Sequence, residues 1–128
     1  MAIKVLPHND EAEQSVLGAI LIDKNAIVPV SEILRTEDFY SDLNGLIYGA
    51  MLTLSEGRKA IDLVTLTEQL KKNKDLKKID SSYLTDLVEK VPTAVNVKHY
   101  ADGVKEDSTK RFLISAGVEI AELGYGEN

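Results

Sequence analysis

The sequence contains no cysteine and no tryptophan, and aromatic residues make up only 5% of its 128 positions. Without cysteine there is neither a disulfide bond nor a thiolate zinc site, which fits a reducing compartment. The apolar run at residues 16–22 is far too short to cross a membrane, and the first ten residues lack the apolar core of a signal peptide. We therefore expect a cytoplasmic domain without a membrane partner, built around an aliphatic core.

The motifs that mark common catalytic sites are also missing. The sequence has no G-x-x-x-x-G-K-[ST] phosphate loop, no H-E-x-x-H and no G-x-S-x-G. His99 precedes Asp102 by three residues, a spacing that could place two metal ligands on one helix face, but no third ligand is evident. Glu11 and Glu13 are two residues apart on a predicted helix and so do not face each other. We interpret both as surface charges near the positive end of the helix dipole, and we predict no catalytic residue, no metal site and no cofactor in this chain.

Positive charge is scarce, since the formal net charge is −6. Proteins that grip a phosphate backbone rely on clustered Lys and Arg, so this balance argues against DNA binding by the whole domain. Two local basic patches, at residues 71–78 and 110–111, are flanked by acids and read best as solvated helix ends. They leave an alternative function open, namely an accessory module that binds single-stranded DNA, although the scarcity of aromatic rings weighs against it.

The clearest positive feature is helical periodicity, in a chain that is 44% hydrophobic. Residues 9–23 join a carboxylate-rich first turn, capped by Asn9 or Asp10, to an apolar second half that predicts the central helix of a small core. Further caps are expected at Asn25, Asp62 and Asn96. No strand alternation persists, so we predict an all-α fold of about six helices. These helices are expected at residues 9–23, 26–34, 42–55, 63–72, 81–90 and 97–123.

The last predicted helix is apolar over an unusually wide arc in its second half. One stripe contains Leu113, Ala116, Ile120 and Leu123, and an offset stripe contains Ile114, Val118 and Ala121. Such a helix needs cover on more than one side, and the rest of this short chain has little left to supply it. We therefore expect a partner, either another copy or a following helix. The small residues that would permit close approach are Ala116, Gly117 and Ala121.

Three side chains are candidates for binding another protein. A tyrosine on a helix beside a charged loop, as at Tyr83, is a common binding anchor, although packing within the fold explains it as well. For Ile114 and Ile120 the two-stripe pattern leaves packing and an intermolecular role equally open.

Several segments together resemble the N-terminal domain of the bacterial replicative DNA helicases of the DnaB type. Pro7 followed by EAEQSVLG at residues 11–18 is similar to the opening signature of that family, and DFY at residues 38–40 is similar to its next turn. Residues 44–50 match its H-x-x-I-F segment loosely, with Asn44 or Gly45 where histidine is usual. The remaining segments follow in the order of the family: IDLVTL at residues 61–66, Tyr83-Leu84, and VPTA at residues 91–94.

The resemblance implies a helical globule at residues 1–95 and the first arm of a truncated helical hairpin at residues 96–128. Hairpins of this family pair between subunits and build a hexameric collar, so the oligomerisation residues would be Leu113, Ala116, Gly117, Val118, Ala121 and Leu123. The C-terminal domain of primase docks on that collar. The positions carried over for this contact are Tyr83, Ile114 and Ile120, with Glu11 as a weaker candidate.

The resemblance also implies what this chain does not do. The motor of the family, an ATPase that uses ATP and magnesium, lies beyond a linker and is absent here. The expected function is therefore oligomerisation and primase docking during DNA replication, with DNA contacted only through the parent hexamer. A helicase loader is a further partner that the sequence leaves open.

Overall fold

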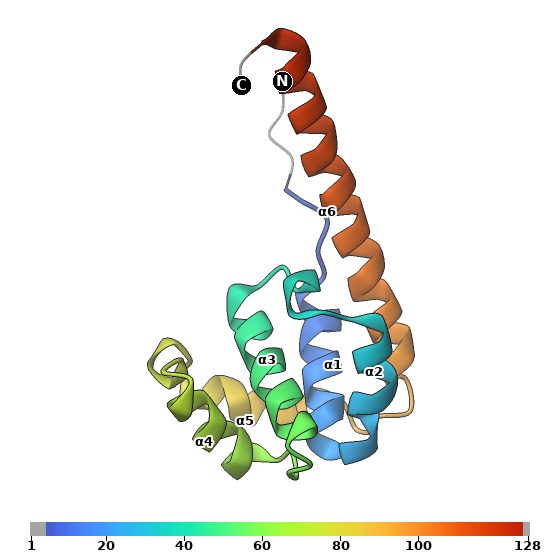
Figure 1. Ribbon diagram of the computed structural model, residues 1–128. Helices are drawn as coiled ribbons and strands as arrows, with labels where there is room; N and C mark the ends of the chain where they lie inside the picture. Colours follow the sequence, from blue (N-terminus) through green and yellow to red (C-terminus); the bar gives the residue numbers. More distant parts are fainter. Residues whose placement is uncertain (1–4, 127–128) are drawn as a thin grey trace.

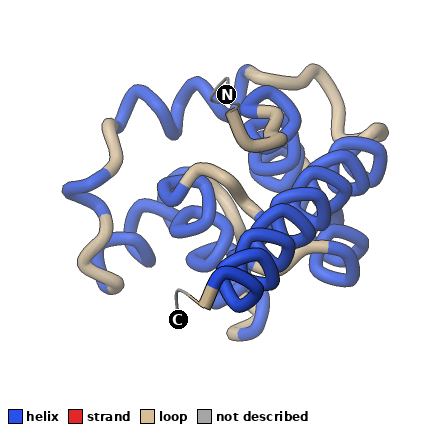
Figure 2. Tube along the Cα trace, turned by 90° about the horizontal axis from the view of Figure 1, so that it is seen from above, coloured by secondary structure: helices blue, strands red, loops and turns tan. Residues whose placement is uncertain are grey.

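The computed structural model describes residues 5–126, and every regular element within them is helical (Figure 2). The six α-helices confirm the predicted all-α fold, and three short 3-10 turns at Lys24–Ala26, Thr36–Asp38 and Leu76–Lys78 lie between them. No helix among these residues is long and apolar enough to span a membrane. Residues 1–4 and 127–128 of the two predicted regions lie outside the described part. The α-helices are α1 (Asp10–Ile22), α2 (Ile27–Ile33), α3 (Asp42–Glu56), α4 (Leu63–Lys72), α5 (Ser81–Glu89) and α6 (Val97–Tyr125).

The central position predicted for the first helix is confirmed. Helix α1 packs against α3, α5 and α6 (Figure 1). Residues 15–20 are all buried, whereas Leu21 is half-buried and Ile22, the last residue of the helix, is exposed. Gly18 permits the closest of these approaches, because a Cβ atom there would lie 2.2 Å from the carbonyl oxygen of Leu87 in α5. The aliphatic core predicted from composition is therefore assembled around α1, with Tyr48 of α3 as its largest fully buried side chain.

The capping predictions were right at some helix ends and wrong at others. The side chain of Asn9, rather than Asp10, caps α1 by accepting from the Ala12 N–H at 3.0 Å, and Asp62 caps α4 as expected. Asn25 does not cap the second helix. Asp23 instead accepts from the Asn25 N–H at 2.9 Å and starts a 3-10 turn, so α2 begins at Ile27 and is shorter than predicted. Asn96 occupies the N-cap position of α6 but makes no capping bond with its side chain.

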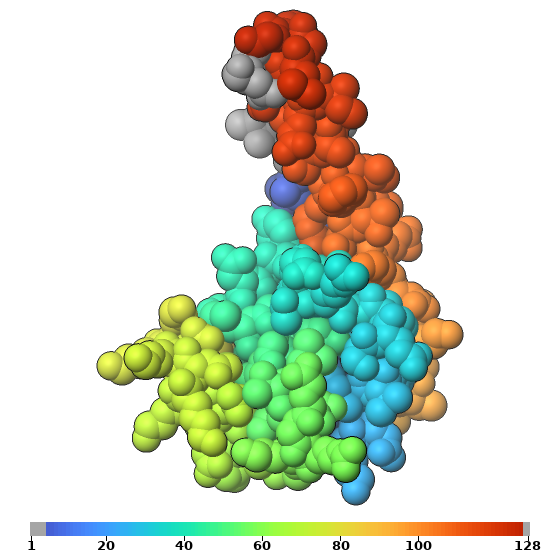
Figure 3. All heavy atoms as spheres, viewed as in Figure 1, coloured from blue at the N-terminus to red at the C-terminus, as the bar shows by residue number. Residues whose placement is uncertain are grey.

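Helix α6 changes character along its length. Its first turns contribute Val97, Ala101 and Val104 to the core, whereas none of its residues after Val104 is buried. The second half rises alone beyond the other helices (Figures 1 and 3). The helix continues to Tyr125, slightly past the predicted end, and closes on Gly126, whose φ of 74° is the left-handed conformation that favours glycine.

Candidate protein-interaction surfaces

The exposed half of α6 (residues 112–125) carries the clearest candidate surface. We call it the arm; it is the outer part of the longer hairpin arm expected at residues 96–128. None of its side chains is buried, whereas the first turns of α6 contribute to the core. Leu113, Ile120 and Leu123 are each more than 60% exposed, and Ile114 and Val118 are 43% and 52% exposed. Gly117 and Ala121 are exposed beside them and Ala116 is half-buried. Solvated apolar side chains gathered on one helix are typical of a surface that a partner covers.

A second candidate surface lies on the globule around Tyr83 of α5. The ring of Tyr83 packs against the core and is partly exposed, while its hydroxyl group donates a hydrogen bond to the Oδ1 atom of buried Asn44. Burial raises the pKa of the Tyr83 phenol above its ordinary value. The side chain therefore stays neutral at physiological pH, with one end tied inside the fold and one edge in solvent.

The prediction that Glu13 is a surface charge was wrong. Its side chain is 1% exposed, and its carboxylate accepts from the Tyr40 N–H at 2.8 Å, the Ser41 N–H at 3.3 Å and the Nδ2 group of Asn44 at 3.0 Å. These groups belong to the N-terminal end of α3, where unpaired N–H groups and the helix dipole favour an anion. A signal was present in the sequence, because Glu13 shares the helix face of Leu17 and Ile20, which is the core face of α1.

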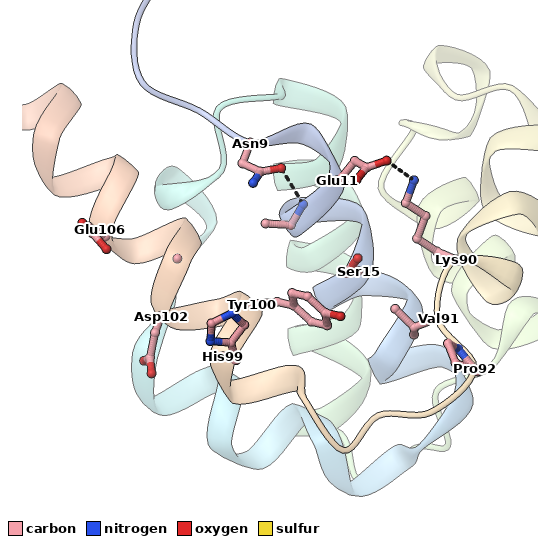
Figure 4. Close-up of a pocket in the computed structure, with 12 residues that line it drawn as sticks. Asn9, Glu11, Ser15, Lys90, Val91, Pro92, His99, Tyr100, Asp102 and Glu106 are labelled. Atoms are coloured by element: carbon pink, nitrogen blue, oxygen red, sulfur yellow. Dashed lines mark hydrogen bonds and ion pairs between the residues drawn. The ribbon is translucent and has the colours of Figure 1, made fainter.

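Glu11, in contrast, is exposed and lies at the edge of an open pocket between α1, the segment after α5 and the start of α6 (Figure 4). Its carboxylate pairs with Lys90 at 3.6 Å, and its side chain is 85% exposed. An ion pair this exposed contributes little stability, so Glu11 remains available to a partner. The pocket also brings in His99 and Asp102, the pair considered as metal ligands. Within residues 5–126 no group of three or more His, Asp and Glu side chains gathers closely enough to hold a metal ion.

A polar cluster that the sequence did not indicate joins α6 to the globule, ahead of the arm. Asp38 is 5% exposed and accepts from Ser108 at 2.7 Å, from Lys105 at 3.2 Å and from the Arg35 N–H at 2.7 Å. Burial alone would raise the pKa of Asp38, but these three donors outweigh it and hold the pKa below its ordinary value. The cluster fixes α6 against the 3-10 turn at Thr36–Asp38, just below the point where the arm becomes exposed.

The basic patch at residues 110–111 takes part in the same junction. The guanidinium group of Arg111 donates to the carbonyl oxygens of Pro7 and Asp38, both at 2.7 Å, and Lys110 pairs with Glu106 at 3.4 Å. In the other patch, Lys78 pairs with Asp75 at 3.1 Å. Arg111 is therefore engaged within the chain, whereas the exposed ion pairs of Lys110 and Lys78 hold those two cations only weakly.

The fold defines a class: a small, entirely helical domain, within the described residues, whose last helix carries a row of exposed apolar side chains. The model of the DnaB-like helicase N-terminal domain matches residues 5–106. The chain therefore belongs to the family of DnaB-like helicase N-terminal domains, as its motifs predicted.

Relatives of known identity agree with this assignment. The chain is 45% identical over 123 residues to the replicative DNA helicase DnaB of Geobacillus stearothermophilus and 44% identical over 120 residues to the replicative DNA helicase DnaC of Bacillus subtilis. These matches cover 95% and 93% of this chain but only 27% and 26% of the relatives. The chain thus spans about a quarter of the length of the helicases it resembles.

Solved structures of the same domain share the fold. The crystal structure of the N-terminal domain of DnaB helicase from Mycobacterium tuberculosis has a TM-score of 0.93 at 38% identity, covering 96% of this chain and 89% of that one. The N-terminal domain of DnaB helicase from Helicobacter pylori has a TM-score of 0.78 at 27% identity, with 90% of each chain covered. The structure of the latter was described together with its interactions with primase.

Proposed function

We propose that this domain is an oligomerisation and docking module of a replicative helicase, which builds the hexamer collar and binds primase during DNA replication. The observation that carries the proposal is the arm. Seven large apolar side chains are exposed on one half of α6. A monomeric domain rarely exposes so many neighbouring apolar groups to water, so we infer that a partner covers them. The exposed side chains are Phe112, Leu113, Ile114, Val118, Ile120, Leu123 and Tyr125.

In this proposal the arm serves self-association, and the surface around Tyr83, together with part of the arm, binds primase. The arm pairs with another copy through its small and aliphatic residues, and a second hairpin arm covers the remaining face. Tyr83 on the globule, with Ile114 and Ile120 on the arm, contacts the C-terminal domain of primase, and Glu11 modulates that contact. Burial of these apolar groups by the partner would favour one state of the ring, and a few kcal/mol of differential affinity suffices for such a shift.

The proposed mechanism is physical rather than chemical. The sequence contains no phosphate-loop motif, so we assign ATP and magnesium, and the unwinding of DNA, to a motor domain of the parent helicase. The parent would act in the cytoplasm, and a helicase loader would be a further partner of the assembled ring. The alternative of direct binding to single-stranded DNA has no specific observation in its favour, because Arg111 is engaged within the fold and the formal net charge is −6.

A calorimetric titration of this domain with the C-terminal domain of the matching primase tests the proposal. We expect saturable binding that is lost in Tyr83→Ala and in Ile114→Ala. Thr85→Ala, an exposed change two residues away on α5, should bind as the wild type does.

A wild type that gives no heat would contradict docking by this chain. Repeating the titration with a chain extended by about forty residues, room for a second arm of similar length, would then separate a contact that needs both arms from a wrong partner.

A further inference from the structure

The buried network that begins at Glu13 ends at Tyr83, and this connection has a direction. An ionised carboxylate only accepts hydrogen bonds. The carboxylate of Glu13 therefore requires that the side chain of Asn44 turn its Nδ2 group toward it, at 3.0 Å. The carbonyl Oδ1 of Asn44 must then face the opposite way, where it accepts from the hydroxyl group of Tyr83. The contacts of Glu13 thus set the orientation of the Asn44 amide, and that orientation presents an acceptor to the Tyr83 hydroxyl group.

The first two side chains of this network are buried, and its polar atoms are paired. Glu13 and Asn44 are each 1% exposed, and no buried side-chain nitrogen or oxygen among the described residues lacks a partner. Protein groups bind both ends of the Asn44 amide and so fix its orientation. Hydrogen bonds in such a setting are costly to break, because the freed group is left without a partner.

The same network spans three helices. Glu13 lies on α1, Asn44 in the first turn of α3 and Tyr83 in the first turn of α5. The hydrogen bond from the Tyr83 hydroxyl group to Asn44 joins residues 39 apart in sequence, and the side chain of Gln14 on α1 also hydrogen-bonds to the Tyr83 phenol. The ring of Tyr83 is half-buried, at the boundary between core and solvent. A boundary tyrosine without such an anchor could rotate about its side-chain bonds and would lose that freedom on binding a partner.

We propose that Glu13 and Asn44 are positioning residues for the docking surface, which hold the ring of Tyr83 in its binding orientation before the partner arrives. The inference rests on the proposed function, in which Tyr83 contacts primase, and it adds two buried residues that never touch the partner. Pre-organisation of this kind raises affinity by reducing the ordering that binding demands.

We call the connected side chains of Glu13, Asn44 and Tyr83 the relay. Two substitutions test it, with the C-terminal domain of primase as the probe. Tyr83→Phe removes only the hydroxyl group, and Asn44→Ala removes its acceptor. Each should weaken binding by about threefold to tenfold, the equivalent of one hydrogen bond. The double variant should bind no more weakly than Asn44→Ala, because both changes cut the same link.

Tyr48→Phe is the matched control. It also removes a buried tyrosine hydroxyl, which donates to the Leu34 carbonyl oxygen at 2.9 Å, but it leaves the Tyr83 network intact. A purely structural effect would lower the melting temperature of all three single variants and leave affinity unchanged at a temperature where each is folded. The relay predicts that Tyr48→Phe alone keeps wild-type affinity. A direct hydrogen bond from Tyr83 to the partner predicts instead that Asn44→Ala binds normally, which would overturn the relay.

Failure of the relay and failure of the docking site have different signatures. If Tyr83→Ala binds primase as the wild type does, the docking surface is misplaced and the relay falls with it. If Tyr83→Ala abolishes binding while Asn44→Ala does not weaken it, the docking surface stands and the relay is wrong.

A second measurement needs no partner. The Tyr83 hydroxyl proton should be protected from exchange and visible in proton NMR spectra of the wild type, and it should disappear in Asn44→Ala. A freely exchanging proton in the wild type would overturn the proposal.

Discussion

The two halves of α6 share one unbroken backbone helix and have opposite surroundings. Residues 97–104 supply Val97, Ala101 and Val104 to the core, at 6%, 0% and 2% exposure. In the arm, Leu113 and Ile120 have the same apolar character and are 63% and 68% exposed. Local sequence thus determines that the helix forms, but only tertiary partners determine which apolar residues stabilise it. The globule buries its apolar side chains within the chain, whereas the apolar side chains of the arm remain exposed.

The largest difference between the two regions should appear in stability. Leu17→Ala removes a fully buried side chain from α1 and should lower the free energy of unfolding by about 2–5 kcal/mol. Leu113→Ala makes the same chemical change on the arm, where the side chain is mostly in solvent, and should cost less than about 0.5 kcal/mol in the monomer. Urea denaturation of both variants at low concentration measures this. Equal losses in the free energy of unfolding would show that the arm is packed in solution, and the difference between the two regions would not exist.

The junction between the regions should be the next most sensitive place. Asp38→Asn weakens the contacts to Lys105 and Ser108 and should lower the free energy of unfolding by about 1–3 kcal/mol at neutral pH, as expected for hydrogen bonds to a charged group. Glu37→Gln, an exposed change next to it, is the control and should have little effect.

The pH dependence of Asp38→Asn gives a further check. Because the folded-state pKa of Asp38 lies below 3.8, its contribution is fully present above that value and is lost as the pH falls through the folded-state pKa. The gap in melting temperature between wild type and variant should therefore shrink below about pH 4. A gap that is constant down to about pH 2 would contradict a role for the charge.

Inside the globule, Tyr48→Phe should lower the free energy of unfolding less than Asp38→Asn does, and it should also change the titration of tyrosine at high pH. Burial, and secondarily the charge of Asp38, raises the pKa of Tyr48 to about 12. The stability that the neutral phenol contributes is fully present below its unfolded pKa of about 10 and is lost as the pH rises through the folded value. Tyr48→Phe should cost about 1–2 kcal/mol at neutral pH and remove the latest-titrating phenol from the absorbance titration. An unchanged titration curve would show that another tyrosine is responsible.

Much of this comparison could be predicted from the sequence. Periodicity located six helices and distinguished the narrow apolar stripe of residues 97–104 from the wide one that follows. It could do so because the spacing of apolar residues along a helix is a local property of the sequence. It could not predict the contacts of Glu13 or Asp38. Asp38 meets Lys105 and Ser108 across 67 and 70 residues, and such polar pairs follow from how the helices are packed rather than from any local pattern. The burial of Glu13 was readable from its helix face, but its partners in α3 were not.

The smallest expected effect on stability is also the one that bears most directly on the arm. Ile120→Asp places a charge where the side chain is already solvated, so the free energy of unfolding of the monomer should change by less than about 0.5 kcal/mol and the helix content should stay the same. If the arm pairs with another copy, the same change buries an unpaired carboxylate in the interface and should shift the mass in sedimentation toward monomer. Glu119→Gln, a neighbouring exposed change, should leave the mass of the wild type unaltered. A dimeric wild type whose mass does not respond to Ile120→Asp would move the pairing surface away from this stripe, and the exposed side chains of the arm would then belong to the primase contact alone.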